Sequence, residues 1–418
     1  MLKVLDTFAG AGGFSLGFQL AGFEIVGGIE VDQWASDTFS FNHPNVHALH
    51  RDIASISDDE LRSIFSAKRK PDVIIGGPPC QGFSIANRNA GDPKDPRNSL
   101  FVEFLRVGRV LEPAVMIMEN VPNLVGAKTS EGEDVLEIIK SSLRDLGYEV
   151  SSSILNANDY GVPQMRSRLF VIASKVKLAS PFPEATHVWR AEPDTGSLFE
   201  VGLTRCPTLW DAISDLPVLK ACEGGEELAY TCEPQTEYQK TLRGNATMVF
   251  NHKAMNHTKR IVERFESMEC GHTSSDLAEH LMPRKRNSTE LATAAYGQNN
   301  RRMHADRPCH TIAASFYANF VHPFQHRNFT AREGARIQSF PDSFRFLGKP
   351  TVVSRKLLSR EDRQEENFLC QYNQIGNAVP PILAKAVATN LASELKKATH
   401  LLDICKTPTR RIEAVEIL

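Results

Sequence analysis

The most informative stretch of this sequence is Pro71–Ser84, PDVIIGGPPCQGFS. Its first half is a short apolar run that predicts a buried strand, and its second half is a stiff glycine and proline loop that presents Cys80. The two prolines fix the backbone just before the cysteine, and the flanking glycines allow a flat ligand or another backbone to approach. A buried core cysteine needs none of these features. We therefore interpret Cys80 as a nucleophile displayed at the end of a strand.

Short apolar runs alternate with amphipathic stretches on both sides of this loop. We expect strands at 3–7, 23–30, 73–76, 114–119, 148–155 and 169–173, and helices at 14–21, 33–42, 100–111 and 134–146. This order is typical of an α/β fold with a doubly wound, mostly parallel sheet. Ligands of such sheets bind at the carboxyl ends of the strands, so we expect the loops that follow these strands to share one site.

The regular pattern stops near residue 178. From there to about residue 324 the sequence is rich in proline, histidine and charge, but its aromatic residues provide material for a second core. We expect four parts: a catalytic and cofactor-binding domain (1–177), a second, smaller and irregular lobe (178–348), a charged connector (349–371), and a C-terminal segment that returns to the first domain (372–418). The pattern suggests no function for the connector.

Composition limits the classes of function. The chain has 418 residues, 41% of them hydrophobic, which is enough for two lobes, and its net charge of −2 means that any basic surface must be local. The eight cysteines include no Cys-x-x-Cys pair, and Cys270 with His272 is the nearest approach to a ligand pair, so we expect no metal. No uninterrupted apolar run reaches 18 residues, and the acidic, glycine-rich N-terminus is unlike a signal peptide. We expect a cytoplasmic protein with no membrane partner.

Six stretches of the chain together resemble one family. The loop at Cys80 resembles the nucleophile motif of the cytosine-C5 DNA methyltransferases of bacterial restriction-modification systems. Five further stretches resemble that family's motifs in the family's order: Asp6–Gly13 (DTFAGAGG), Met118–Val121 (MENV), Tyr160–Arg168 (YGVPQMRSR), Arg332–Pro341 (REGARIQSFP) and Gln374–Pro381 (QIGNAVPP). The resemblance implies a Rossmann-like, S-adenosylmethionine-dependent methyltransferase whose second lobe recognises the target sequence in duplex DNA.

The glycine turn after the first predicted strand indicates a nucleotide-like ligand. It lacks the third glycine of Gly-x-Gly-x-x-Gly, because Ser15 stands there. Glu30 ends the second predicted strand, where a carboxylate can bind ribose hydroxyls, and Asp52 and Ile53 offer an acceptor and an apolar wall for adenine. The alternative for each carboxylate is a solvated loop position. The resemblance implies an S-adenosylmethionine pocket formed by Phe8, Gly10, Gly12, Glu30, Asp52, Ile53, Pro79, Leu100 and Asn377.

The implied reaction needs a thiolate and an acid. Carbon 5 of cytosine is a poor nucleophile until a group adds to carbon 6, and Cys80 and Glu119 are the candidates for the thiolate and for the acid near ring nitrogen 3. A buried glutamate in a structural pair with arginine is the alternative. Arg166 and Arg168 are expected to share one strand face, one binding the base oxygen and the other holding Glu119 or a phosphate. The family pattern favours Arg168 near the base. Carbon 6 is inaccessible within the stack, so the nucleotide must flip out.

DNA contacts are expected from two regions. The polar loop Gln81–Asn98, with Ser84, Arg88 and Arg97, is long enough to close over DNA. In the second lobe we expect base and phosphate contacts from Arg284, Lys285, Arg286, Arg301, Arg302 and Thr311. Any single one of these charges has a solvated surface position as its alternative.

Two other functions fit the same motifs. A tRNA cytosine-C5 methyltransferase has the same fold but usually a small second lobe, and the long stretch 178–324 favours duplex DNA. A catalytically silent DNA-binding relative is disfavoured because Cys80, Glu119, Arg166 and Arg168 are all present. We expect a monomer that associates with the nucleoid through DNA, and a cognate restriction endonuclease would act as a separate protein.

Overall fold

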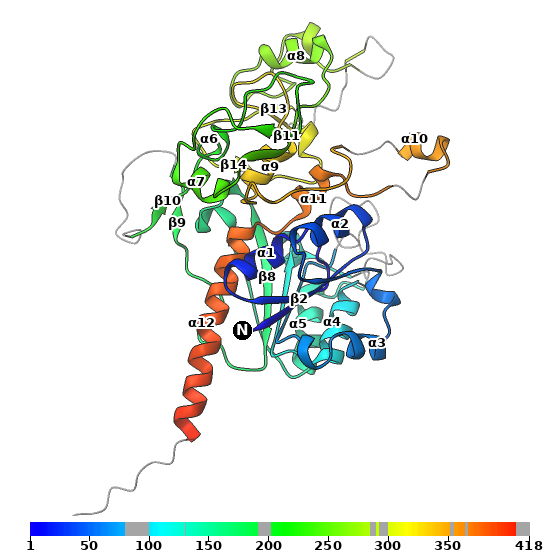
Figure 1. Ribbon diagram of the computed structural model, residues 1–418, viewed down its shortest axis with the longest axis vertical. Helices are drawn as coiled ribbons and strands as arrows, with labels where there is room; N and C mark the ends of the chain where they lie inside the picture. The colour runs from blue at the N-terminus through cyan, green and yellow to red at the C-terminus, as the bar shows by residue number, and fades with distance from the viewer. Residues whose placement is uncertain are drawn as a thin grey trace, which may run out of the picture.

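The computed structural model describes residues 1–79, 100–129, 131–190, 202–284, 290–291, 300–351, 355–363 and 367–406. They form two lobes stacked end to end, with the helix α12 (Pro381–Lys406) running down one side of the first lobe and beyond it (Figure 1). The first lobe contains a seven-stranded sheet, and the second contains short two-stranded sheets and helices. The predicted α/β class with a smaller second lobe is confirmed.

The large sheet has the strand order β3-β2-β1-β4-β5-β8-β6. Its first five strands are parallel to one another, whereas β8 runs antiparallel to both β5 and β6. The strand order reverses between β1 and β4, which is where ligands of such sheets bind. The strands are β1 (Lys3–Asp6), β2 (Glu24–Glu30), β3 (His47–His50), β4 (Val73–Gly76), β5 (Val115–Asn120), β6 (Glu149–Asn156) and β8 (Ser167–Ser174).

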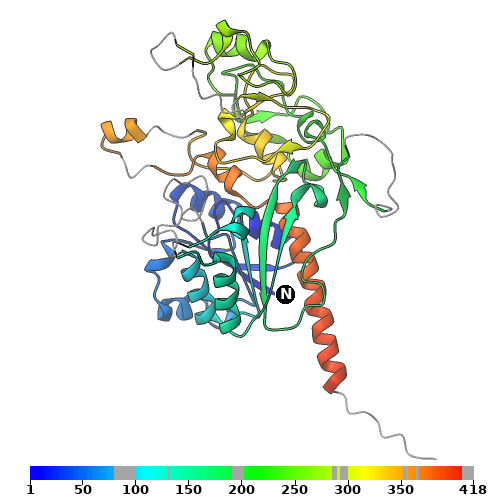
Figure 2. The same ribbon diagram turned by 180° about the vertical axis from the view of Figure 1, so that it is seen from behind.

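Helices cover both faces of this sheet. On one face, Phe14 and Phe18 of α1 and Leu383 and Val387 of α12 belong to a single buried cluster. On the other face, α3, α4 and α5 contribute to a second buried cluster, and Figure 2 shows α4 and α5 on that side. The helices of the first lobe are α1 (Gly13–Leu20), α2 (Gln33–Asn42), α3 (Asp58–Ile64), α4 (Leu100–Leu111), α5 (Val135–Asp145) and α12 (Pro381–Lys406).

Polar residues just before the helices define where they begin. Asp32 accepts a hydrogen bond from the Ala35 amide and begins α2, and Ser57 accepts one from the Glu60 amide and begins α3. Such caps satisfy backbone donors that the helix itself leaves unpaired. For α2 and α4, the predicted bounds 33–42 and 100–111 agree with the structure.

The second lobe is held together by buried charge as much as by apolar packing. Arg336 donates to Asp215 and Asp342, and Arg327 pairs with Glu333 at 2.7 Å, all fully buried. Its elements are β9 (His187–Val188), β10 (Thr204–Arg205), α6 (Leu209–Ile213), β11 (Gly224–Ala229), α7 (Glu237–Arg243), β12 (Met248–Lys253), α8 (Lys259–Glu266), β13 (Arg301–Arg302), β14 (Cys309–His310), β15 (Phe320–Val321) and α9 (Ala331–Ile337). The strand β14 pairs with β7 (Gln164–Met165), which joins the lobes.

The C-terminal segment divides between the lobes. We predicted that everything from residue 372 returns to the first domain, but Tyr372 and Ile375 of α11 (Gln371–Asn377) belong to the core of the second lobe. The return begins at α12, which lies so close to α1 that no side chain fits between Gly17 and Ala384. That part of the prediction is corrected because the apolar side chains of α11 face the second lobe.

The charged connector is a long loop whose two ends lie next to each other. The Gln371 amide donates to the Lys349 carbonyl at 3.1 Å, so its two ends lie side by side. Phe368 and Gly348 both contact Trp34 at the start of α2. Between these ends, α10 (Arg355–Arg360) stands away from the body (Figure 1).

Among the described residues, no helix combines the length and hydrophobicity that a membrane span requires.

Candidate active site

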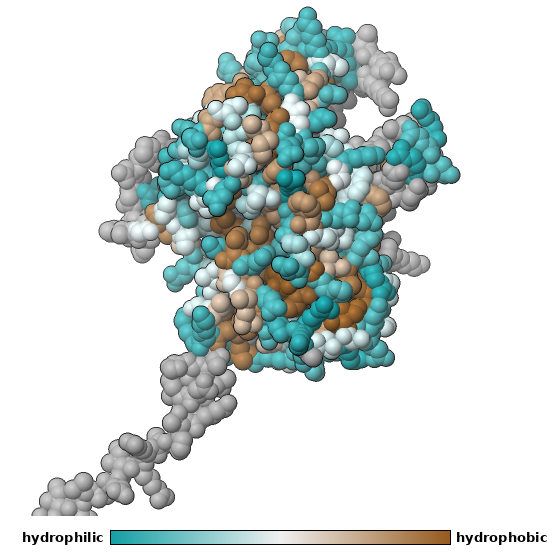
Figure 3. Space-filling model, viewed as in Figure 1, coloured by the Kyte–Doolittle hydropathy of each residue, from teal (hydrophilic) through white to brown (hydrophobic). Residues whose placement is uncertain are grey.

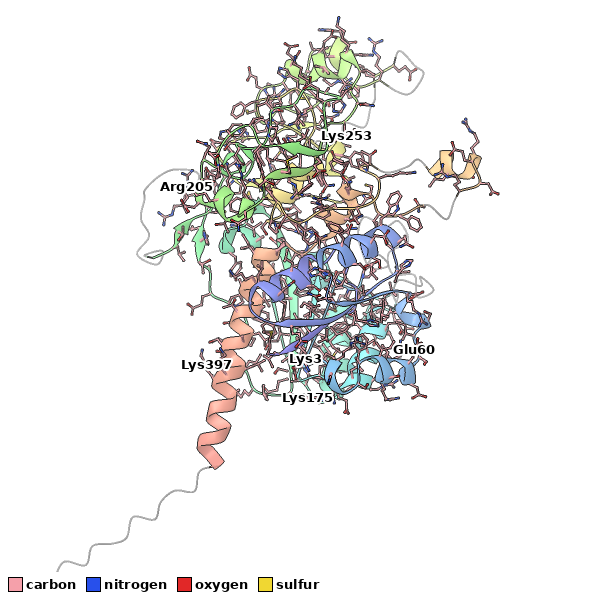
Figure 4. The ribbon with its side chains drawn as sticks, in the orientation of Figure 1. Lys3, Glu60, Lys175, Arg205, Lys253 and Lys397 are labelled. Atoms are coloured by element: carbon pink, nitrogen blue, oxygen red, sulfur yellow. The ribbon has the colours of Figure 1, made fainter. Side chains whose placement is uncertain are left out.

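The carboxyl ends of β4 and β5 bring two predicted motifs together. Gly76 pairs with Met118, so the next residues of both strands lie side by side. A Cβ placed on Gly77 would lie 3.2 Å from Oε2 of Glu119, and Nδ2 of Asn120 donates to the Pro78 carbonyl at 2.9 Å. The site faces the second lobe, whereas Lys3 and Lys175 mark the opposite end of the sheet (Figure 4). Cys80 itself lies outside the described residues, and Gly77, the residue beside Glu119, precedes it by three positions in the sequence.

Glu119 is paired with Arg168. Only 8% of the Glu119 residue is exposed, and its Oε1 lies 2.9 Å from Nε of Arg168. The antiparallel pairing of β5 with β8 produces this contact, because it brings the start of β8 to the end of β5. Burial raises the pKa of Glu119 above its ordinary value, and the charges of Arg168 and Arg166 oppose the rise. A raised pKa suits a carboxyl group that must hold or share a proton.

Arg166 has a different task from the predicted one. It is buried, and its guanidinium donates to the carbonyls of Ile312 at 2.7 Å, Gly376 at 2.9 Å and Ala378 at 3.2 Å. Arg168 is therefore the residue that holds Glu119, and the prediction that Arg166 contacts the carboxylate or a phosphate is wrong. The physical reason is that three backbone carbonyls surround its two terminal nitrogens.

The glycine turn after β1 is held by Glu30. Its carboxylate accepts from the Gly10 amide at 2.7 Å and from the Asp32 amide at 2.8 Å, and burial raises its pKa. Gly12, with φ of 97°, precedes α1 in a left-handed conformation that favours glycine. A Cβ on Gly10 would meet nothing within 4 Å, so open space lies beside the turn and the carboxylate. This combination fits a ligand with ribose hydroxyls.

The structure brings together three apolar residues of the predicted cofactor pocket. Phe8, Ile53 and Leu100 pack in the same apolar cluster. Asp52 is exposed, and one of its oxygens accepts from the Ala54 amide at 3.0 Å, which begins the short helix Ile53–Ser55. The structure places Pro79 exposed at the end of the Gly-Pro-Pro loop and Asn377 exposed at the end of α11. An acceptor beside an apolar wall fits an adenosine group, so these residues fit S-adenosylmethionine.

Two residues that the sequence analysis did not assign to the site help to shape it. Asn120 holds the Pro78 carbonyl, and Ser15 Oγ donates to the fully buried Asp6 at 2.7 Å. Asn120 directly follows Glu119 in the Met118–Val121 motif, so its position was available as a signal. Ser15 occupies the position of the missing third glycine, and its hydroxyl bonds the buried Asp6 carboxyl group, which a glycine could not do.

The predicted DNA contacts have mixed outcomes. Arg302 is buried and donates to the carbonyls of His322 and Pro323, and its second nitrogen donates to Phe265, so the prediction that it contacts DNA is wrong. Successive side chains of a strand point to opposite faces, which turns Arg302 inward while Arg301 stays half-buried at the surface. Arg284 and Thr311 are exposed. Outside the described residues lie Ser84, Arg88, Arg97, Lys285 and Arg286.

Thr311 also helps to join the lobes, because its Oγ1 donates to the Met165 carbonyl at 2.5 Å. Where the structure describes the chain, no three His, Cys, Asp or Glu side chains are grouped so as to hold a metal ion.

Comparisons with known proteins identify the family of this chain. A family model described as C-5 cytosine-specific DNA methylase matches residues 2–393. The type II methyltransferase M.DdeI of Desulfomicrobium norvegicum is 44% identical, over 94% of this chain and 88% of its own. The type II methyltransferase M1.HphI of Haemophilus parahaemolyticus is 36% identical, over 93% of this chain and 86% of its own.

A solved structure shares the fold. It is a DNA modification methyltransferase encoded within an E. coli prophage, with a TM-score of 0.70 and 24% identity, and the match covers 95% of this chain and 100% of that one. The predicted family is confirmed. The chain belongs to the C-5 cytosine-specific DNA methylase family, and it is an S-adenosylmethionine-dependent enzyme that methylates cytosine in DNA.

Proposed function

We propose that this enzyme methylates carbon 5 of one cytosine within a specific sequence of duplex DNA, on a nucleotide flipped out of the helix and bonded through carbon 6 to the sulfur of Cys80. The observation that carries this proposal is the contact between Gly77 and the Glu119 carboxylate, held by the bond from Asn120 to Pro78. It brings the loop that leads to Cys80 against the buried acid. A cytosine ring beside both groups can be attacked at carbon 6 and protonated at nitrogen 3.

The proposed reaction begins when the Cys80 thiolate adds to carbon 6. The ring's electron pair moves toward carbon 5 while Glu119 gives its proton to nitrogen 3, which the raised pKa of this buried carboxyl group favours. S-adenosylmethionine supplies the methyl group that carbon 5 takes up. Carbon 5 then loses its proton to a base, the thiolate leaves carbon 6, and the proton on nitrogen 3 returns to Glu119. The ring is thereby restored and Cys80 is regenerated.

Arg168 orients the acid in this proposal. Its Nε holds Oε1 of Glu119, which leaves Oε2 directed at the Gly77 side of the site. By the family resemblance, the rest of its guanidinium binds the oxygen on carbon 2 of the base. The S-adenosylmethionine pocket is proposed at Gly10, Gly12, Glu30 and Asp52, with Phe8, Ile53 and Leu100 as the apolar wall and Pro79 and Asn377 at its edge.

Sequence recognition is proposed for the second lobe. Arg284, Arg301 and Thr311 lie at least partly at its surface, and the outer end of this lobe is mostly hydrophilic in the face shown in Figure 3. Lys285 and Arg286 remain predicted contacts beyond the described residues, as do Ser84, Arg88 and Arg97. Flipping the base costs about a few kcal/mol, which contacts in the pocket must repay.

The relatives' names extend the proposal. M.DdeI and M1.HphI are type II methyltransferases, so we propose that this chain protects a defined site from a separate restriction endonuclease. We further propose that it acts as a monomer in the cytoplasm, on nucleoid DNA.

The test is a covalent trap. A duplex with 5-fluorocytosine at the methylated position should form a stable adduct with the wild-type enzyme and S-adenosylmethionine, because fluorine does not leave as a proton does. The adduct should be absent from Cys80→Ala, and Cys270→Ala, which changes an exposed cysteine far along the chain, should still form it. An adduct that survives in Cys80→Ala contradicts the proposed nucleophile. Methylation of tRNA in preference to duplex DNA contradicts the proposed substrate.

A further inference from the structure

A continuous seam of hydrogen bonds joins the two lobes beside the active site. On the first-lobe side it involves residues 163–166, and on the second-lobe side residues 309–312. The Cys309 amide donates to the Pro163 carbonyl at 2.9 Å, and the Ile312 amide donates to Oε1 of Gln164 at 2.7 Å. Thr311 closes the seam through its bond to Met165. The strand that leads to Arg168 is thus tied to the segment that carries Thr311.

Arg166 extends this seam to a third segment. One terminal nitrogen donates to the Ile312 carbonyl, directly after Thr311, and the other donates to the Gly376 and Ala378 carbonyls, on either side of Asn377. A single guanidinium therefore touches the backbone next to a proposed DNA contact and on both sides of a proposed cofactor contact. It also lies two residues before the partner of Glu119.

The surroundings of Arg166 indicate that this arrangement is rigid. The residue is 1% exposed, and its two terminal nitrogens donate to three backbone carbonyls, which leaves the guanidinium little freedom to turn. Gln338, at the end of α9, donates to the carbonyls of Ile375 and Ala378, so the same turn is held from a second direction. The guanidinium carries its donors on separate nitrogens in a rigid plane, so it can hold carbonyls of two segments in fixed positions, whereas the donors of a lysine ammonium all lie on one rotatable nitrogen.

We propose that Arg166 is a positioning residue that couples the cofactor side of the site to the DNA side. This inference rests on the proposed function, because it assigns the ligands of Asn377 and Thr311. The segment next to Thr311 and the turn at Asn377 are both bonded to the guanidinium of Arg166, so a ligand that shifts one of them also shifts the guanidinium that holds the other. Binding of one ligand therefore favours the backbone arrangement that the other needs, and thermodynamic linkage makes the coupling reciprocal.

The experiment measures this coupling directly. Bisulfite sequencing first identifies a duplex that the enzyme methylates, and calorimetry then gives the Kd of S-adenosylhomocysteine with and without that duplex. For the wild type we expect the duplex to tighten binding by about fivefold or more, the lower range of typical coupling. In Arg166→Lys we expect the ratio of the Kd without the duplex to the Kd with it to fall to about one. We also expect kcat to fall more than KM changes, because the cofactor side and the DNA side each still bind their ligand while their alignment is lost.

The chain offers a matched control. Arg332 is also fully buried, and it also donates to three backbone carbonyls, those of Phe250, Pro341 and Phe344, all away from the seam. Arg332→Lys should lower thermal stability as Arg166→Lys does, but it should keep the coupling of the wild type. Loss of coupling in both variants, or in neither, overturns the inference.

A second variant covers the case in which Arg166→Lys does not fold. Gln338→Met keeps the volume of the side chain and removes its donors to Ile375 and Ala378, so the coupling should weaken there too. Full coupling in Gln338→Met, or a wild-type enzyme that methylates DNA without coupling, overturns the inference while leaving the proposed function intact. A wild-type enzyme that methylates no duplex refutes the proposed function itself.

Discussion

Replacing Asp6 with asparagine should remove most of a pH dependence from the stability of this enzyme. Asp6 ends β1 beneath the glycine turn, is fully buried, and receives a hydrogen bond from Ser15 at 2.7 Å, whereas its Oδ1 has no partner among the described residues. Burial raises the pKa of Asp6 to about 7, and the nearby charge of Glu30 adds to the rise. The folded protein therefore keeps a proton that the unfolded chain releases.

The sign and size follow from linkage. Asp6 ionises near 3.8 in the unfolded chain and near 7 in the folded one, so its contribution to stability is complete below pH 3.8 and disappears as the pH rises through 7. Each unit of pKa difference corresponds to about 1.4 kcal/mol. Between pH 5 and pH 8 the wild type should lose about 3 kcal/mol of unfolding free energy through this one group. Asparagine has no proton to lose, and its oxygen still accepts from Ser15.

Urea unfolding at pH 5, 6, 7 and 8 checks this prediction. The useful quantity is the change in unfolding free energy with pH, because a constant offset between the two proteins cancels. Asp59→Asn is the control, since that exposed aspartate pairs with Arg62 at the surface and should leave the wild-type profile unchanged. Parallel profiles for wild type and Asp6→Asn would refute the reasoning.

Three further substitutions test the site. Glu119→Gln should lower kcat by about a hundredfold or more in a single-turnover methylation assay while DNA affinity in a gel-shift assay changes little, because the group acts on the ring in the transition state; equal losses in both would contradict this. Glu30→Ala removes a charge-assisted acceptor worth about 1.5–3 kcal/mol, so calorimetry should show S-adenosylhomocysteine binding about ten- to a hundredfold weaker, and unchanged affinity in a folded variant would exclude the assignment. Asn120→Ala releases the Pro78 carbonyl, and kcat should fall by about tenfold to a hundredfold because the nucleophile loop is misplaced, with cofactor affinity retained as the calorimetric check.

The first lobe could be predicted closely because its signals are local. The apolar run at 73–76 and the amphipathic stretches at 33–42 and 100–111 agree with β4, α2 and α4 residue for residue. Each element has its apolar pattern and the polar or glycine residues that mark its ends within one short segment of sequence. The pairing of Glu119 with the Gly-Pro-Pro loop followed from the rule that neighbouring parallel strands end at the same edge.

The arginines of the second lobe and the seam could not be assigned in this way. Arg302 bonds to carbonyls some twenty residues along the chain, and Arg166 bonds to carbonyls 146 and 210 residues away. The residues next to an arginine in the sequence do not show whether its side chain satisfies buried carbonyls or contacts phosphate. Only the three-dimensional path of the chain distinguishes them. The same limit explains why α11 was assigned to the wrong lobe.

The position of α12 also determines the order in which the protein can be completed during synthesis. This helix supplies Leu383, Val387 and Leu391 to the cluster that also holds Phe14 and Phe18, so one face of the N-terminal sheet stays partly uncovered until α12 has been synthesised. Roughly 200 residues separate the last sheet strand from Leu391, which corresponds to about 10–40 s of translation at ordinary ribosome speeds. During that interval the nascent chain exposes the apolar side of α1. The second lobe is therefore synthesised before α12 can cover this face of the first lobe. Packing of α12 against α1 is therefore a late step in the completion of the catalytic lobe.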